Sequence, residues 1–245
     1  MSQQDQKKKV VLITGGSRGI GEAIVQKFKS QGWLVATCAT SEERLEKSLA
    51  DFRFKCDVSK AEEVKSGVEQ VVKRFQGIDV LVNNAGFADD NSLKPNADNE
   101  IWNKVIGINL NGTYYMSKYA LHHLPNNTGR IINLGSVLSL KGVGDAIAYC
   151  AAKHGVLGLT RALANRLAKR KITVNAVCPG WVRTDMAKTR MDEIGIDEED
   201  LKTSVPLGRI VEPREVADLV YYLATSEGAA MITGQALTID GGYLA

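Results

Sequence analysis

Residues 10–21 read Val-Val-Leu-Ile-Thr-Gly-Gly-Ser-Arg-Gly-Ile-Gly, and this stretch decides the fold. Its four leading aliphatic residues predict a short strand that is covered on both faces, as strands of parallel sheets are. Beyond Gly21, the apolar residues Ala23, Ile24 and Phe28 follow helical spacing. Glycines permit a tight turn and close approach of a ligand, and the free amides at a helix start attract a pyrophosphate. The order of strand, glycine turn and helix is that of a dinucleotide-binding site, and a plain strand-to-helix turn is the alternative.

The rest of the chain alternates strand-like and helix-like segments. We expect strands near 33–38, 52–56, 78–82, 130–134, 171–178 and 236–239, and helices near 43–50, 60–75, 98–124, 149–169 and 213–224. Such alternation predicts an α/β fold of Rossmann type, a doubly wound parallel sheet with helices on both faces. No repeat, linker or low-complexity tract divides the chain, so residues 1–245 are predicted to form a single domain. The polar, acidic segment at about 184–206 is interpreted either as a substrate lid or as a solvated surface helix.

Composition narrows the class of partner and the compartment. The 31 basic and 28 acidic residues give a net charge of +3, which is too balanced to indicate a nucleic-acid or membrane partner. No apolar run approaches the ~20 residues of a membrane span, and the first residues lack the apolar segment of a signal peptide. The three histidines lack a metal-ligand spacing, so no metal site is predicted. Without a C-x-x-C spacing, four cysteines are interpreted as reduced, buried residues of a cytoplasmic protein: Cys38, Cys56, Cys150 and Cys178.

The end of the second predicted strand indicates which coenzyme the glycine turn would hold. Sites for the unphosphorylated dinucleotide usually place an acid here for the ribose hydroxyls, whereas this chain reads Ala-Thr-Ser at 39–41 and has no carboxylate before Glu42. With Arg18 in the glycine turn, the site suits a 2′-phosphate and therefore NADP(H), unless Arg18 is a solvated loop residue. Asp57 follows the next strand and either caps the following helix or accepts a hydrogen bond from an adenine amino group.

A candidate for proton transfer lies in the second half of the chain. Ser136 follows a predicted strand, and Tyr149 and Lys153 lie four residues apart on one face of the next helix. A nearby ammonium stabilises a phenolate and lowers the phenol pKa from about 10, and Ser136 would hold a substrate oxygen beside it. On its own, a Tyr four residues before a Lys is a common pair on any helix surface. Asn109 lies in an apolar run where its amide needs a partner, and packing or water binding explains it as well as catalysis does.

Taken together, these motifs resemble the short-chain dehydrogenase/reductase family in its compact single-domain form, and the resemblance covers nearly the whole chain. The turn at 14–21 (Thr-Gly-x-x-x-Gly-x-Gly) resembles the family's cofactor signature, and residues 83–86 (Asn-Asn-Ala-Gly) resemble its sheet-stabilising motif. The resemblance implies a seven-stranded parallel sheet with a nicotinamide cofactor across the carboxyl ends of its strands. It also implies a homotetramer built on the two long helices and the last strand. Four residues are similar to the family's catalytic set: Asn109, Ser136, Tyr149 and Lys153.

The resemblance further implies roles for single residues. Tyr149 would donate a proton to a substrate carbonyl as hydride arrives, and Lys153 would lower the tyrosine pKa and bind the nicotinamide ribose. Ser136 would donate to the developing alkoxide, Asn109 would hold a water of the proton relay, and Asn83 would lie at the ribose. The implied cofactor contacts are Gly15, Gly16, Ser17, Arg18, Gly19, Ile20, Gly21, Thr40, Asp57, Val58, Asn83, Ala85, Gly86, Tyr149, Lys153, Pro179, Gly180, Val182 and Thr184.

Local likenesses narrow the substrate. Residues 39–42 and 184–186 are most similar to 3-oxoacyl-(acyl-carrier-protein) reductases, and residues 174–180 to polyketide ketoreductases. These likenesses imply an NADPH-dependent carbonyl reductase of a 3-oxoacyl thioester. Reductases that dock an acyl carrier protein have basic residues before the fifth strand, where this chain reads Pro-Asn-Asn-Thr at 125–128, although Arg170 keeps the other expected positive charge. Two alternatives stay open: an NAD(P)-dependent dehydrogenase of a free secondary alcohol or hydroxy acid, and a cofactor-binding sensor without turnover.

Overall fold

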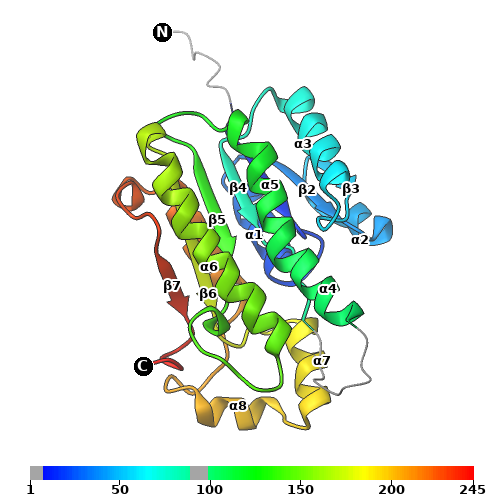
Figure 1. Cartoon of the computed structure of the whole chain (residues 1–245), viewed down its shortest axis with the longest axis vertical. Coiled ribbons are helices and arrows are strands. Elements are labelled where there is room, and N and C mark those ends of the chain that lie inside the picture. The colour runs from blue at the N-terminus through cyan, green and yellow to red at the C-terminus, as the bar shows by residue number, and fades with distance from the viewer. Residues whose placement is uncertain (1–7, 89–98) are drawn as a thin grey trace.

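A seven-stranded parallel sheet lies at the centre of the computed structural model, which describes residues 8–88 and 99–245 (Figure 1). The strands are β1 (Val10–Thr14), β2 (Leu34–Ala39), β3 (Phe52–Lys55), β4 (Val80–Asn83), β5 (Arg130–Leu134), β6 (Thr173–Pro179) and β7 (Ala236–Ile239). Their order is β3-β2-β1-β4-β5-β6-β7, so the winding reverses between β1 and β4. The predicted doubly wound fold is confirmed, and the reversal point is where such sheets bind ligands.

The central strands are buried on both faces because consecutive side chains enter two different cores. In β1, Val10 and Leu12 pack on one side of the sheet, and Val11 and Ile13 pack on the other. The continuous apolar run that predicted this strand therefore follows from double coverage. One side is covered by α3 (Ala61–Phe75), α5 (Gly112–Ala120) and α6 (Ile147–Leu167), which cross the sheet in Figure 1, and the other by α1 (Gly19–Ser30) and α9 (Pro213–Thr225).

The helices α2 (Glu42–Glu46) and α6 differ from their predicted bounds by two residues or more at one end or both. The helix α2 stops short of the predicted Ala50. Leu45 is its one buried residue, so little apolar surface favours a further turn, and Ser48 instead donates to the carbonyl of Gly16 at 3.4 Å. Farther along the chain, α6 begins at Ile147, two residues before its predicted start. Its predicted first residue, Tyr149, therefore lies within the first turn.

The helix expected over 98–124 is divided in two. Asp98 lies outside the described residues, and α4 (Glu100–Ile106) is followed by a π-helical turn at Gly107–Asn111 that leads into α5. The Asn109 side chain donates to the Val105 carbonyl at 2.9 Å and so competes with the backbone amide that would use this acceptor in an α-helix. A polar side chain inside the helix thus accounts for the irregular turn.

The segment near 184–206 forms two short helices, α7 (Asp185–Ile194) and α8 (Glu198–Ser204). Gly195 ends α7 with a φ of 70°, a left-handed conformation that glycine adopts without strain. Both helices contribute side chains to the cavity that also contains Ser136 and Tyr149, called the main cavity below. Both helices also expose charged residues. The segment thus has one face at the cavity and one charged, exposed face, and its role as a substrate lid stays a prediction.

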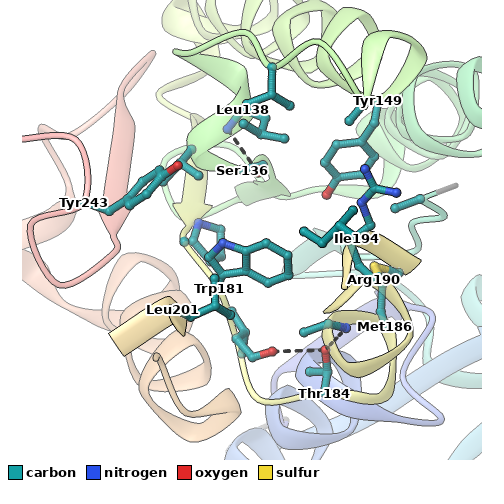
Figure 2. A pocket seen from close by; sticks show the side chains of 18 of the residues that line it. Ser136, Leu138, Tyr149, Trp181, Thr184, Met186, Arg190, Ile194, Leu201 and Tyr243 are labelled. Carbon is teal, nitrogen blue, oxygen red and sulfur yellow. Dashed lines mark hydrogen bonds between the residues drawn. The ribbon is translucent and has the colours of Figure 1, made fainter. Parts of the chain in front are cut away.

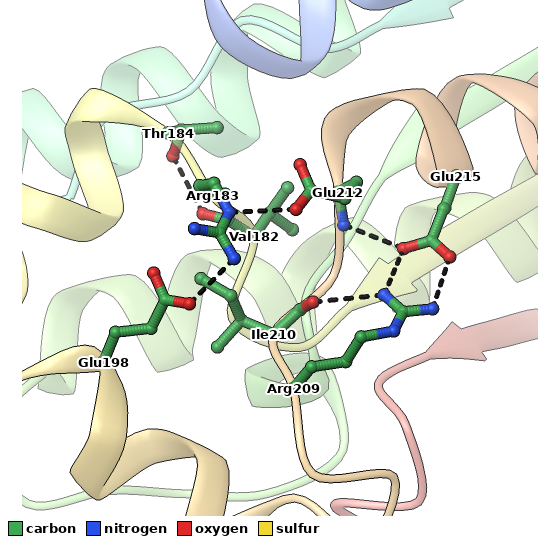
Figure 3. Close-up of polar contacts among 8 residues, drawn as sticks. All are labelled: Val182, Arg183, Thr184, Glu198, Arg209, Ile210, Glu212 and Glu215. Carbon is green, nitrogen blue, oxygen red and sulfur yellow. Dashed lines mark hydrogen bonds and ion pairs between the residues drawn. The ribbon is translucent and has the colours of Figure 1, made fainter.

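The residues just before and just after this segment contact each other. Val182 and Val211 form an isolated parallel bridge. Beside it, Arg183 makes ion pairs with Glu198 of α8 at 2.7 Å and with Glu212 at 2.9 Å, just before α9 (Figure 3). Through Arg183, α8 is linked to the residue that precedes α9, one of the helices that cover the sheet.

The four cysteines are free and buried, as predicted. Within residues 8–88 and 99–245, no helix is long and apolar enough to cross a membrane. The same ranges contain no cluster of three or more side chains suited to hold a metal ion.

Candidate active site

The glycine turn after β1 is closed tightly on its own neighbours. A Cβ at Gly16 would lie 2.3 Å from Thr37 Oγ1, and a Cβ at Gly21 would lie 2.2 Å from the Gly15 carbonyl oxygen. The Gly16 amide donates to the same Thr37 hydroxyl at 3.0 Å. These two glycines are therefore required by packing within the turn, in addition to any ligand that the turn admits.

Asn84, within the residues 83–86 that resemble a sheet-stabilising motif, holds this turn in place. Its side chain donates to the carbonyl of Thr14 at 2.9 Å and to that of Gly15 at 3.1 Å. The backbone amides of Asn84 and Ala85 both donate to the Thr14 hydroxyl, at 3.0 and 2.9 Å. The carboxyl ends of β1 and β4 are thereby fixed to each other at the reversal point of the sheet.

The residues around the turn fit a phosphorylated dinucleotide. Arg18 is the N-cap of α1 and its side chain makes no capping hydrogen bond, so it leaves the first amides of the helix to a pyrophosphate. Arg18 and Thr40 are both exposed, so a cation and a hydroxyl are available to a 2′-phosphate. The first carboxylate after β2 belongs to Glu42, which is paired with Lys55 at 3.2 Å. A ribose hydroxyl would therefore have to compete with Lys55 for the carboxylate of Glu42.

Asp57 bonds with its own loop. Its carboxylate accepts from the backbone amide of Ser59 at 3.0 Å and from the Ser59 hydroxyl at 2.7 Å. The N-cap of α3 is Lys60, without a side-chain cap. Asp57 therefore orders the loop before the helix, and the adenine contact stays a prediction.

A cavity of about 420 Å³ lies beyond the carboxyl ends of β5 and β6 (Figure 2). Leu138, Trp181, Met186, Ile194 and Leu201 give it a largely apolar wall, and α7 and α8 cover one side of it. It brings together seven of the predicted site residues: Ile20, Ser136, Tyr149, Pro179, Gly180, Val182 and Thr184. Tyr243, which is not among the predicted site residues, also reaches this cavity.

Ser136 is positioned by the chain on both sides of it. It follows β5 and is the N-cap of a short 3₁₀ helix at Val137–Ser139. Its Oγ accepts from the Leu138 amide at 3.1 Å, and its own amide donates to Ser139 Oγ at 3.2 Å. The hydroxyl is thus held at the wall of the cavity.

Tyr149 has a higher pKa than the sequence led us to expect. Burial raises its pKa to about 12, and the hydrogen bond with Ser136 offsets part of this rise. The predicted lowering by Lys153 is wrong for this structure because that ammonium is bound elsewhere. Lys153 Nζ donates to the Leu134 carbonyl at 2.7 Å and lies 5.4 Å from the centroid of the Tyr149 ring.

Lys153 is itself buried, with 4% of its surface exposed. Burial lowers its pKa to about 8, since the charged form loses hydration inside the protein. Lys153 and Tyr149 therefore lie one helical turn apart, as predicted, and burial favours the neutral form of each.

Asn109 uses its side chain to hold the loop after β4. Its amide donates to the carbonyl of Phe87 at 2.7 Å and its Oδ1 accepts from the Phe87 amide at 3.3 Å. A Cβ on Gly86 would lie 3.1 Å from Asn109 Oδ1 and 3.9 Å from Lys153 Nζ. Asn109 thus lies near Lys153, but its side chain has protein partners, and a water-binding role stays a prediction.

Two predicted cofactor contacts have side chains that point into the core. Asn83 is 4% exposed and donates to Asn133 Oδ1 at 2.8 Å and to Ser117 Oγ at 3.1 Å. Val58 packs so closely on Gly112 that a Cβ there would lie 2.7 Å from Val58 Cγ2. Any contact of these two residues with a cofactor would have to come from their backbone.

The guanidinium of Arg170 is held in place by neutral acceptors of its own chain. Its Nε donates to Asn126 Oδ1 at 2.8 Å, and its two other nitrogens donate to the carbonyls of Leu121 and Leu124 at 2.7 and 2.6 Å. The guanidinium therefore fastens the loop after α5 to the end of α6. The positive site expected for a carrier protein has a structural use here.

Comparisons with known sequences agree with this geometry. A family model described as Enoyl-(Acyl carrier protein) reductase matches residues 15–244. The granaticin polyketide synthase putative ketoacyl reductase 1 of Streptomyces violaceoruber is 41% identical, over 96% of this chain and 93% of its own length. A 3-oxoacyl-[acyl-carrier-protein] reductase of Haemophilus influenzae is 40% identical, over 96% of this chain and 97% of its own.

Solved structures are also similar to this chain over nearly its whole length. A variant of actinorhodin polyketide ketoreductase with NADPH superposes with a TM-score of 0.90 and 38% identity, and the match covers 99% of both chains. The ligand-free aldohexose dehydrogenase of Thermoplasma acidophilum gives a TM-score of 0.88 and 34% identity, over 98% of this chain and 95% of its own.

Proposed function

This chain belongs to the short-chain dehydrogenase/reductase family, and we propose that it is an NADPH-dependent carbonyl reductase of 3-oxoacyl thioesters. One observation carries the proposal. A single cavity contains Ser136 and Tyr149 together with four of the implied cofactor contacts, Pro179, Gly180, Val182 and Thr184. Relatives that match nearly the whole chain are ketoacyl reductases, which supports the choice of substrate class.

NADPH fits the residues at the other end of the site. The uncapped start of α1, the exposed Arg18 and the exposed Thr40 would hold the pyrophosphate and 2′-phosphate. When bound, the nicotinamide supplies the hydride. The preference over NADH is supported by residues 39–41, which carry no acid, and by the pairing of Glu42, the first acid after β2, with Lys55.

The chain's own residues handle the proton. Tyr149 Oη donates its proton to the oxygen of the substrate carbonyl, and a positioned acid of this kind contributes about 10² to 10⁴ in rate. Ser136 Oγ donates a hydrogen bond to the same oxygen and stabilises the charge that develops there. Lys153 lies behind Tyr149 with a pKa near neutral pH, which suits it to return a proton to the phenol.

The proposal also covers the compartment, the assembly, the lid and the carrier protein. The enzyme is proposed to be a cytoplasmic homotetramer, and α7 with α8 is proposed to act as the substrate lid. An acyl carrier protein is not the first partner proposed, because residues 125–128 (Pro-Asn-Asn-Thr) lack the basic side chains that carrier-dependent reductases have there. A free thioester is therefore the first substrate to try.

Oxidation of NADPH, followed at 340 nm, tests the proposal with a short 3-oxoacyl thioester, the matching ester and simple ketones. We expect the thioester and ester to be reduced with NADPH faster than with NADH. Tyr149→Phe should bind NADPH as the wild type does and lose about 10² to 10⁴ in turnover. Retained turnover in this variant, or a clear preference for NADH, would contradict the assignment.

A second candidate is a dehydrogenase of a free secondary alcohol. The similarity to the aldohexose dehydrogenase favours it, since that protein has nearly the same fold over its whole length. Reduction of NAD(P) with a panel of sugars and hydroxy acids separates the two candidates. Turnover in this direction alone would replace the first proposal.

A further inference from the structure

Arg190 and Asp145 form a charged pair in the wall of the main cavity. Arg190 lies on α7, and its side chain, 16% exposed, points toward the end of the cavity that holds Tyr149 (Figure 2). One guanidinium nitrogen, Nη2, donates to Asp145 Oδ2 at 2.6 Å and to the Asp145 carbonyl at 3.1 Å. The other, Nη1, donates to Glu193 at 3.0 Å. The guanidinium is therefore paired with two carboxylates of its own chain, of which that of Asp145 is 54% exposed.

These two residues account for the charge on the cavity wall. Among the lining residues within the described ranges, Arg190 and Asp145 are the charged ones, and the rest are apolar or carry hydroxyl groups. Glu193 binds the same guanidinium but does not line the cavity. A carboxylate on a substrate would thus find one cation in this wall, already occupied by a carboxylate.

We propose that Asp145 is a specificity residue that occupies Arg190 in place of a substrate carboxylate, so that the cavity selects uncharged carbonyl compounds over free keto acids. This inference rests on the proposed reductase function and states the substrate class of the same site. It predicts that esters, thioesters and plain ketones are accepted and that the acids matching them are rejected.

The physical basis is competition for one donor. Asp145 accepts from Arg190 Nη2 through both its carboxylate and its backbone carbonyl. Because Asp145 belongs to the same chain, its effective concentration at Arg190 is high, and a substrate carboxylate would have to displace it. If it does not displace Asp145, it lies near a like charge in an apolar cavity, where an unpaired ion is costly to bury. An uncharged ester or thioester meets neither penalty.

Asp145→Ala tests the proposal through the ratio of kcat/KM for ethyl 3-oxohexanoate to that for 3-oxohexanoate, both with NADPH. In the wild type we expect the ester to be preferred. Removal of the internal carboxylate should free Nη2 for the acid and lower the ratio by about 10-fold or more, mainly through a lower KM for the acid. Arg190→Met in the Asp145→Ala background should reverse this gain, because the cation that binds the acid is gone.

Glu193→Gln is the matched control. It removes a carboxylate from the same guanidinium on the side away from the cavity, and we expect the ratio to stay within about twofold of the wild type. A thermal melt of each variant reports whether the lid and fold are intact. An unchanged ratio in a folded Asp145→Ala variant, or an equal shift in Glu193→Gln, would overturn the proposal. If the wild type reduces neither compound, the proposed function itself fails, and that outcome is distinct from an unmoved ratio.

Discussion

At the scale of single residues, burial controls the two groups that handle protons. Lys153 is 4% exposed and bound to the Leu134 carbonyl, and burial lowers its pKa from 10.5 to about 8. Tyr149 has its pKa raised from 10.0 to about 12 by the same cause. The spacing of the two residues could be predicted from the sequence. Their pKa values could not, because they depend on how deeply the first turns of α6 lie against the sheet.

The lowered pKa of Lys153 predicts a pH dependence of stability. Between the folded pKa of about 8 and the unfolded value of 10.5, the unfolded chain binds more protons at this residue, so stability rises with pH. Above pH 10 the raised pKa of Tyr149 acts in the opposite direction, because the folded state then holds the extra proton. We therefore expect stability to rise by about 2 kcal/mol between pH 8 and pH 10 through Lys153.

Urea unfolding of the wild type and of Lys153→Met at a series of pH values measures this effect. The free energy of unfolding of the wild type minus that of Lys153→Met should rise between pH 8 and pH 10, because all other titrating groups are common to both proteins. A difference that stays flat from pH 8 to pH 10 would mean that Lys153 titrates at its ordinary pKa in the folded chain.

At the scale of elements, the junction of β1 and α1 depends on the absence of a side chain at Gly21. A methyl group there would lie 2.2 Å from the Gly15 carbonyl oxygen and 2.5 Å from Asn84 Nδ2. Gly21→Ala should therefore destabilise the cofactor-free chain by about 1 to 3 kcal/mol. Gly144→Ala is the control, because no atom lies within 4 Å of a Cβ at that position. Equal urea midpoints for the two variants would show that Gly21 is needed for the ligand alone.

Most elements could be predicted because their signals are local. The strands β5 and β7 have the predicted bounds, since a short apolar run between turn residues is enough to define a buried strand. The exceptions arise where a side chain competes with backbone hydrogen bonding. Asn109 divides the long helix with a π turn, and Ser48 bonds to the glycine turn beyond the shortened α2. Both contacts depend on the local or tertiary path of the chain, which periodicity does not encode.

At the scale of the whole molecule, the site combines contacts that the sequence signals and contacts that it does not. Ser136 and Tyr149 belong to one continuous motif, so their meeting in the cavity was predictable. Arg190 meets Asp145 across 45 positions of sequence. Arg170 reaches Leu121 across 49 positions, and this contact holds the guanidinium in place. Such pairs follow from the way β6 returns the chain beside β5, and no local pattern marks them.

The exposed face of α6 leads to a prediction about assembly. Ala151, Gly158 and Ala162 are exposed there, and a Cβ at Gly158 would have no atom within 4 Å in its own chain. Gly158→Arg therefore fits the single chain and replaces a poor helix former with a good one, so folding should not suffer. In a tetramer built on the long helices, the same change places a charge where two helices approach closely.

Sedimentation velocity distinguishes these effects. We expect the wild type to sediment as a tetramer and Gly158→Arg as a smaller species with the same circular dichroism. Gln70→Arg on the exposed surface of α3 should remain tetrameric, because that helix is not part of the proposed interface. A tetrameric Gly158→Arg would place the interface on another face, and a monomeric wild type would remove the homotetramer from the proposed function.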